Sequence, residues 1–131
     1  MRTKRVKYKR INSNFLPVIK IKISGPKKAK EVDALLDTGA STTTITPELC
    51  EELSLEKIAE TPVVTASNTE IVGLYKSKII FVGIPFETYV ASCKIPKEHP
   101  IRVLIGRDLM QFFKIVFDGP KVTIEIKSDL F

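Results

Sequence analysis

The stretch "LLDTGAST", Leu35–Thr42, sets one ionisable side chain, Asp37, between an apolar run and several small polar residues. Thr38 offers a hydroxyl that can fix a loop, Gly39 offers a backbone N–H without a Cβ in the way, and Ala40 leaves room for another chain. A tight turn, a buried cap and one half of an acid–base pair would all use these residue types. The other parts of the chain have to distinguish among them.

A single carboxylate is a poor acid and base for the activation of water. That task needs a second carboxyl about 3 Å away. Two carboxyls at this distance cannot both ionise, so the pair holds one proton between them. The chain has one motif of this kind, since Asp108 stands in "GRDL" and Asp118 in "FDGP". We therefore expect the second carboxylate to come from another copy of the chain.

A second motif, "VLIGRDLM", Val103–Met110, has the pattern of an apolar strand that breaks at Gly106 and continues with helix formers. In this order, the two motifs resemble those of the retropepsins, the single-domain aspartic proteases of retroviral type, and of their cellular relatives. The resemblance covers residues 17–127. It implies a mostly β, closed acid-protease fold with one or two short helices, active as a homodimer.

The resemblance implies that Asp37, Thr38 and Gly39 form the catalytic set. Asp37 would face Asp37 of a second subunit across a twofold axis, with one shared proton and a water molecule between them. Thr38 would join the two loops by hydrogen bonds, and Gly39 would line the cleft. The implied activity is hydrolysis of peptide bonds by this water, with no metal and no other cofactor.

Peptide substrate would be contacted in two places, according to the same resemblance. One is the loop itself, through Gly39, Ala40 and Ser41. The other is the polar tip of a hairpin, the flap, which would close over a bound peptide with Ala66, Ser67, Asn68 and Thr69. Structural support of the site is implied for Leu104, Ile105, Gly106, Arg107 and Asp108.

Two departures from the retroviral pattern bear on this site. Retroviral enzymes usually carry an Asp where this chain has Ser41, and that Asp can pair with the Arg of the second motif. Arg107 therefore needs another partner, which the sequence does not identify. The flap sequence "TASNTE" also lacks a glycine-rich run, so we expect a stiffer and more polar flap.

Structural interpretations of the same residues stay open. Arg107 and Asp108 suit an ion pair and a cap at a helix start. The polar residues of the flap tip suit turn chemistry. Asp37 itself suits a turn in a catalytically inactive module of the same fold that binds peptides or dimerises, although an unpaired buried Asp would be costly.

The formal net charge of +6 is concentrated at the start of the chain. Of the 21 basic residues, six lie in "MRTKRVKYKR", which leaves 15 basic and 15 acidic side chains elsewhere. We expect residues 1–14 to be a basic, disordered arm and residues 15–131 to form a single domain. The arm offers a weak contact for anionic nucleic acid or lipid, or serves only as a solubilising segment.

Other classes of protein are disfavoured by the sequence. No apolar run approaches the length of a transmembrane helix and the basic start precedes no signal core, so we expect a soluble, cytoplasmic protein. Cys50 and Cys93 lie far apart, and His99 is the single histidine, so we expect no metal site. We expect both cysteines to be core or helix residues and His99 to lie in a surface loop.

The alternation of residues predicts about eight or nine short strands. Clear examples are "PVIKIKI" and "EVDALL", two strands that lead into the first motif. "TPELCEEL", Thr46–Leu53, has the start signals of a short helix. Hairpins are expected over 61–75, 76–95 and 114–126. The alternating "KVTIEIKSDLF" at the end suits a strand between subunits, or an edge strand of the chain's own sheet.

Overall fold

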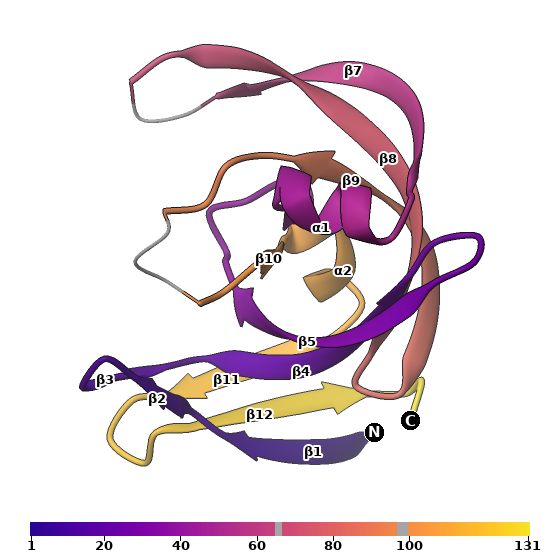
Figure 1. The fold of residues 1–131 in the computed structure, drawn as a ribbon. Coiled ribbons are helices and arrows are strands. Elements are labelled where there is room, and N and C mark those ends of the chain that lie inside the picture. Colours follow the sequence, from indigo (N-terminus) through magenta and orange to yellow (C-terminus); the bar gives the residue numbers. More distant parts are fainter. Residues whose placement is uncertain (65–66, 97–99) are drawn as a thin grey trace.

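The computed structural model describes residues 1–64, 67–96 and 100–131, and strands dominate these ranges. Six strands follow one another in a sheet that closes on itself, because the first strand also pairs with the last (Figure 1). In sheet order they are β4 (Val18–Ser24), β5 (Ala29–Leu36), β10 (Val103–Ile105), β6 (Thr44–Ile45), β9 (Ile84–Ser92) and β8 (Thr69–Phe81). The expected closed, mostly β acid-protease fold is confirmed.

Two short helices accompany the barrel, α1 (Pro47–Glu52) and α2 (Arg107–Met110), as expected. Among the described residues, no helix is both long and apolar enough to cross a membrane. The described ranges hold twelve strands, which is more than the sequence suggested. The surplus comes from the short β6 and from three strands in the first sixteen residues.

Alternation along β4 shows why the barrel forms. Ile19, Ile21 and Ile23 are at most 4% exposed, whereas Lys20 and Lys22 between them face solvent. Side chains on a strand point to opposite faces in turn, so this period of two buries one complete row of isoleucines. The buried row joins one core cluster with apolar residues of β5, β8, β10 and both helices.

The two motifs of the sequence lie side by side in the sheet. β10 runs parallel to β5, with Leu104 opposite Leu35 and Ile105 opposite Leu36. The other edge of β10 pairs with β6, which follows the Asp37 loop in the chain. The residues after β5 and the residues after β10 therefore leave the sheet at the same place.

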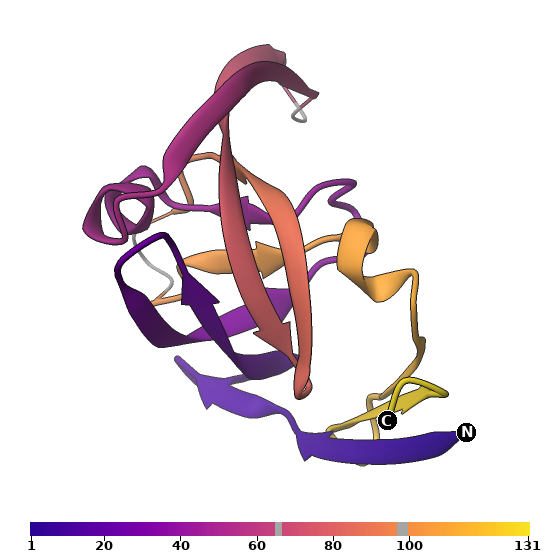
Figure 2. The same ribbon diagram turned by 90° about the vertical axis from the view of Figure 1, so that its right-hand side faces the viewer.

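A long hairpin, here called the flap, extends from this barrel. It consists of β7 (Glu56–Val64) and the first half of β8, and β7 pairs with β8 alone in the sheet order. Figure 2 shows it arching above the end of the barrel where the Asp37 loop emerges. The expected tip residue Ala66 lies outside the described residues, whereas Ser67, Asn68 and Thr69 are exposed at the end of the hairpin.

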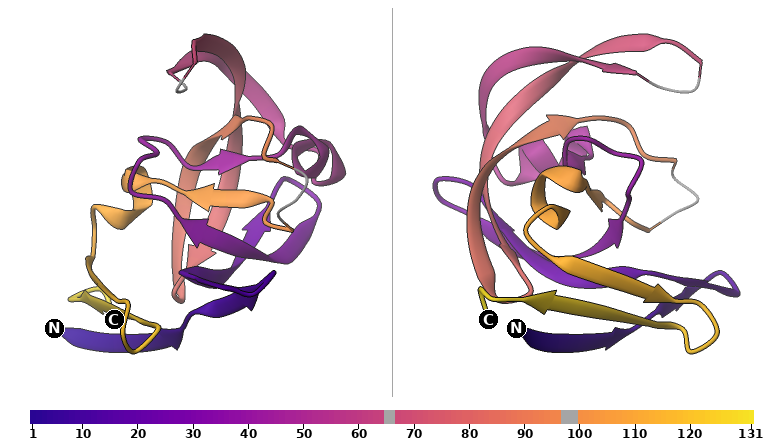
Figure 3. Two further views of the ribbon diagram at one scale, coloured as in Figure 1. Left: turned by 90° about the vertical axis from the view of Figure 1, so that its left-hand side faces the viewer. Right: turned by 180° about the vertical axis from the view of Figure 1, so that it is seen from behind.

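The start of the chain is not the disordered arm that the sequence suggested. β1 (Arg2–Lys7) pairs with β12 (Thr123–Ser128) over six residue pairs, and β11 (Lys114–Asp118) lies on the other side of β12. This three-stranded sheet lies beneath the barrel (Figure 3). β12 is thus the middle strand of this sheet. The interpretation of "KVTIEIKSDLF" as an edge strand of the chain's own sheet is therefore wrong.

Side chains explain why so basic a segment is ordered. Arg5 donates to Glu125 at 2.8 Å. Lys4 Nζ donates to the Val82 carbonyl at 2.7 Å and lies 4.5 Å from the centre of the Phe131 ring. These partners come from distant parts of the chain, so composition alone suggested disorder. A hairpin of β2 (Lys9–Ile11) and β3 (Asn14–Leu16) continues from β1, with Ile11 buried.

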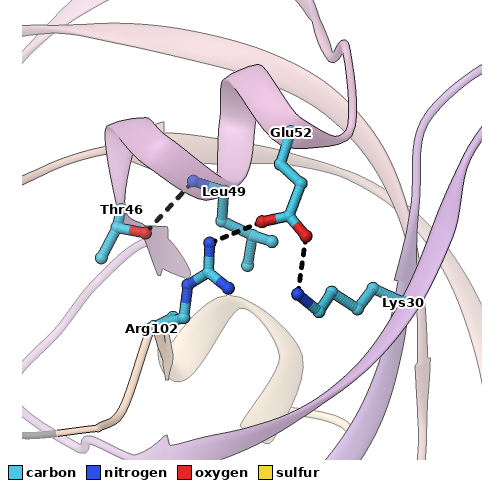
Figure 4. A network of polar contacts seen from close by, with 5 residues as sticks. All are labelled: Lys30, Thr46, Leu49, Glu52 and Arg102. Atoms are coloured by element: carbon cyan, nitrogen blue, oxygen red, sulfur yellow. Dashed lines mark hydrogen bonds and ion pairs between the residues drawn. The ribbon is translucent and has the colours of Figure 1, made fainter.

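Helix α1 is held at both ends, as Figure 4 shows. At its start, the Thr46 hydroxyl accepts a hydrogen bond from Leu49 N at 3.4 Å. At its end, Glu52 accepts from Lys30 of β5 at 2.6 Å and from Arg102, directly before β10, at 2.8 Å. The hydrogen bond from Lys30, followed by that from Arg102, lowers the pKa of Glu52 to about 2.

This network predicts a pH-dependent effect of Glu52→Gln. A carboxyl whose pKa is lowered by folding stabilises the folded state above its unfolded pKa of about 4.3, and this contribution disappears as the pH falls toward 2. Thermal unfolding should show Glu52→Gln melting below the parent at pH 7, with the two curves converging near pH 2. Glu51→Gln, one residue earlier on the exposed side of α1, is the control. Equal effects of both substitutions at all pH values would contradict this account.

Candidate active site

Asp37 is the first residue after β5, and its backbone is fixed by the second motif. Asp37 N donates to the Ile105 carbonyl at 2.9 Å, which extends the β5–β10 ladder by one bond. The Asp37 residue is half-buried at the mouth of the barrel, whereas Thr38 and Gly39 beyond it are exposed. The loop therefore presents its carboxylate from a rigid base to an open surface.

The loop closes with a turn that uses the Asp37 side chain. Gly39 N donates to Asp37 Oδ1 at 2.9 Å, and Ala40 N donates to the Asp37 carbonyl at 3.2 Å. The turn interpretation of Asp37 is thus present in the structure. It does not compete with a chemical role, because the bond from Gly39 also fixes the direction of the carboxylate.

Arg107 finds its partner within the same loop. Its Nη1 donates to the Thr38 carbonyl at 2.6 Å, and its backbone N donates to the Ala40 carbonyl at 2.8 Å. A main-chain oxygen thus takes the place of the carboxylate that retroviral enzymes usually have at Ser41, which is exposed here. The ion pairs of the described ranges do not include Arg107, so the helix-start ion pair is not formed there.

Asp108 clamps the far end of the loop. Its Oδ2 accepts from Thr43 N at 2.9 Å, while its Oδ1 accepts from the Thr43 hydroxyl at 2.8 Å and from Leu109 N at 2.9 Å. The N-cap of α2 is Gly106 and no side chain caps this helix, so the cap that one interpretation of the sequence expected is not formed. Asp108, in the first turn of α2, binds the segment of Thr43 instead. Thr43 is completely buried, and its hydroxyl accepts from Gly106 N at 3.2 Å.

Thr43 is the residue that sequence reasoning missed. It stands in the run "TTT", where nothing distinguishes it from Thr42 and Thr44, and its partner lies 65 positions away. The one signal in the sequence is the alternation along the strand. Residues two positions apart face the same side, and Ile45 is buried, so Thr43 also faces inward.

Gly106 permits the close approach of the two motifs. A Cβ at this position would lie 2.8 Å from the Thr42 carbonyl carbon and 2.9 Å from the Ala40 oxygen. Any side chain there would push the loop away from α2. Of the five predicted support residues, Ile105, Gly106, Arg107 and Asp108 contact residues 37–43. Leu104 pairs with Leu35 and Thr44 in the strands on either side of it.

Two hollows formed by the described residues, of about 810 and 410 Å³, are not lined by Asp37. The larger one lies at the start of α1, against Thr46 and Glu48.

Of the two cysteines, Cys50 is buried in α1 and Cys93 is half-buried after β9. His99, expected in a surface loop, lies outside the described residues.

The close contact at Gly106 predicts a stability cost for Gly106→Ala. Forcing a methyl group against the Ala40 and Thr42 backbone should lower the free energy of unfolding by about 1–3 kcal/mol. Gly119→Ala is the matched control, because a Cβ there meets nothing within 4 Å; it should change stability by less than about 0.5 kcal/mol. Urea unfolding measures both, and a neutral Gly106→Ala would refute the tight contact.

Comparison with known proteins agrees with this geometry. The sequence profile of the family described as "Aspartyl protease" matches residues 19–109, from β4 to α2. No curated protein sequence matches the chain.

Solved structures share the fold at low sequence identity. EIAV protease complexed with the inhibitor HBY-793 has a TM-score of 0.59 at 21% identity, covering 77% of this chain and 90% of that one. A retropepsin-like aspartic protease from Rickettsia conorii has a TM-score of 0.60 at 16% identity, covering 95% and 91%. Simian foamy virus (mac) protease has a TM-score of 0.53 at 16% identity, covering 72% and 92%. The chain belongs to the aspartyl protease family and has the retropepsin-like fold.

Proposed function

We propose that the protein is a homodimeric aspartic endopeptidase in which the Asp37 carboxyls of two subunits activate one water molecule. The observation that carries the proposal is the loop itself. Asp37 stands half-buried on a turn whose two ends are fixed by Arg107 and Asp108. Such fixation is what a catalytic carboxylate needs, because it must meet its partner group within a few tenths of an ångström.

The proposed reaction needs two adjacent carboxyls, whereas the loop of one chain supplies only Asp37, so a second subunit is required. Among the described residues, no hydrogen bond or ion pair joins another carboxylate to Asp37. The residues next to it, Thr38 and Gly39, are exposed in the single chain. In the proposed dimer these exposed residues meet their twofold copies, which covers the loops and brings the two carboxyls together.

The proposed reaction needs only the two carboxyls and water. One Asp37 takes a proton from the water as its oxygen attacks the peptide carbonyl carbon, while the other, protonated, donates to the carbonyl oxygen. The tetrahedral diol then collapses: the Asp37 that took the proton from water gives it to the leaving nitrogen, the C–N bond breaks, and the other, ionised Asp37 takes a proton back from a hydroxyl of the diol. The peptide would lie extended between flap and loop, along Gly39, Ala40 and Ser41, with backbone bonds providing affinity.

Asp37→Asn tests the catalytic role. The amide oxygen of Asn still accepts from Gly39 N, so the fold and the melting temperature should be kept, while cleavage of a peptide library should fall by about 10³-fold or more. Equal cleavage by parent and variant would refute the role of Asp37.

The same variant separates the enzyme from the alternative of an inactive peptide-binding module. That alternative draws on the Gly39–Asp37 bond, which gives Asp37 a purely structural use. A parent protein that binds peptides as tightly as Asp37→Asn and cuts none of them would establish the binding module.

The shared proton predicts a particular pH profile and a dependence on concentration. Because the two carboxyls titrate as a unit, kcat/KM should follow a bell-shaped curve on the acidic side of neutral. Specific activity should also fall on dilution as dimers dissociate. Cleavage assays over pH and protein concentration measure both effects. A specific activity that stays constant down to concentrations where sedimentation detects only monomers would contradict the two-subunit site.

The first ten residues contribute less free positive charge than their composition suggests. Arg5 pairs with Glu125, Lys9 pairs with Asp33, and Lys4 binds the Val82 carbonyl. We therefore assign to this segment no more than a weak contact with anionic nucleic acid or lipid, secondary to the peptidase activity.

A further inference from the structure

Glu70 is an acidic residue of the flap whose direction follows from the register of the hairpin. Cross-strand partners share a face, and the pairs are Val63 with Glu70 and Thr61 with Val72. The three neighbours of Glu70 on this face, Thr61, Val63 and Val72, are all half-buried. Glu70 itself is exposed at the end of this half-buried row, close to the tip of the hairpin.

The opposite face of the flap is turned to solvent. It carries the pairs Pro62 with Ile71 and Val64 with Thr69. Val64 is 81% exposed and Ile71 is 65% exposed, although both are apolar. Figure 2 shows the hairpin arching over the barrel. Because residues on the face of Glu70 are half-buried while those on the other face are exposed, we take the face of Glu70 to be turned toward the barrel.

An electrostatic effect on the barrel supports this direction. The pKa of the Cys93 thiol is raised first by burial and then by the negative charge of Glu70. Cys93 belongs to the barrel wall, since its backbone N donates to the carbonyl of Ile45 in β6 at 2.9 Å. β6 directly follows the Asp37 loop, so Glu70 acts on the same part of the barrel wall that leads out of this loop.

The charge of Glu70 has no counter-charge in the described part of the chain, where none of the ion pairs includes it. Glu60, on the solvent-facing side of the flap, does pair with Lys57 at 3.0 Å. A peptide under the flap would remove water from Glu70, which is costly for an unpaired carboxylate. A cationic side chain on the peptide would offset that cost, whereas an apolar or acidic one would not.

We propose that Glu70 is a specificity-determining residue that selects peptides with a Lys or Arg side chain beneath the flap. The inference rests on the proposed peptidase function and adds its substrate class. In the twofold enzyme each flap contributes one Glu70, so basic residues are favoured on both sides of the cleaved bond.

The test compares matched peptides in which one position at a time is Lys or its uncharged counterpart norleucine. At about pH 6, the parent should cleave the best Lys peptide with a kcat/KM at least about tenfold above that of its norleucine partner. Glu70→Gln should reduce this ratio to about one, and Glu70→Lys should bring it below one, in favour of the norleucine peptide. Glu60→Gln, which removes the same charge from the other face of the flap, should leave the ratio as in the parent.

Two results would overturn the proposal: a parent without preference for Lys at any position, or equal loss of the preference in Glu70→Gln and Glu60→Gln. If the parent cleaves no peptide, the proposed function fails separately, and binding of fluorescent Lys and norleucine peptides to Asp37→Asn decides the role of Glu70. Preferential binding of Lys peptides that is lost on adding Glu70→Gln supports it. Equal or absent binding of the two peptides refutes it.

Discussion

The partly buried contact between Asp108 and Thr43 is the interaction on which the rest of the site depends. One carboxylate accepts three hydrogen bonds, two of them from a completely buried threonine. Bonds to a charged acceptor are about twice as strong as neutral ones, and breaking one inside a protein leaves its partners unsatisfied. The clamp joins α2 to the segment after "DTG", so two motifs that are far apart in the chain behave as one rigid unit.

The other contacts around the loop act only because this clamp holds. With α2 fixed against Thr43, the Arg107 guanidinium comes within reach of the Thr38 carbonyl, and Gly106 can pass against the Ala40 and Thr42 backbone. Ser41, which is exposed, stands where the sequence departs from the retroviral pattern. Because a main-chain carbonyl receives Arg107, the chain can dispense with a carboxylate at position 41.

Much of the fold could be predicted from local patterns. The isoleucines of β4 and the pair "LLDTGAST" and "VLIGRDLM" identify the barrel and its loop, because strand alternation and glycine positions are visible in the letters. It could not be predicted that residues 2–7 form an ordered strand. The stability of β1 comes from β12 and from partners such as Glu125 and Phe131 at the other end of the chain. Thr43, the partner of Arg107 and the direction of Glu70 were hidden for the same reason. Each of these three features depends on strand register or on a contact between residues far apart in the sequence. The predicted flap residue Ala66 lies outside the described ranges.

The central claim is that one active site is assembled from two copies of Asp37. The most direct measurement is a crystal structure of the dimer with a transition-state-analogue peptide bound. The account predicts the two Asp37 carboxyls at hydrogen-bonding distance, about 3 Å, with one inhibitor for two chains. Carboxyls separated by clearly more than hydrogen-bonding distance, or one inhibitor bound to each chain, would contradict it.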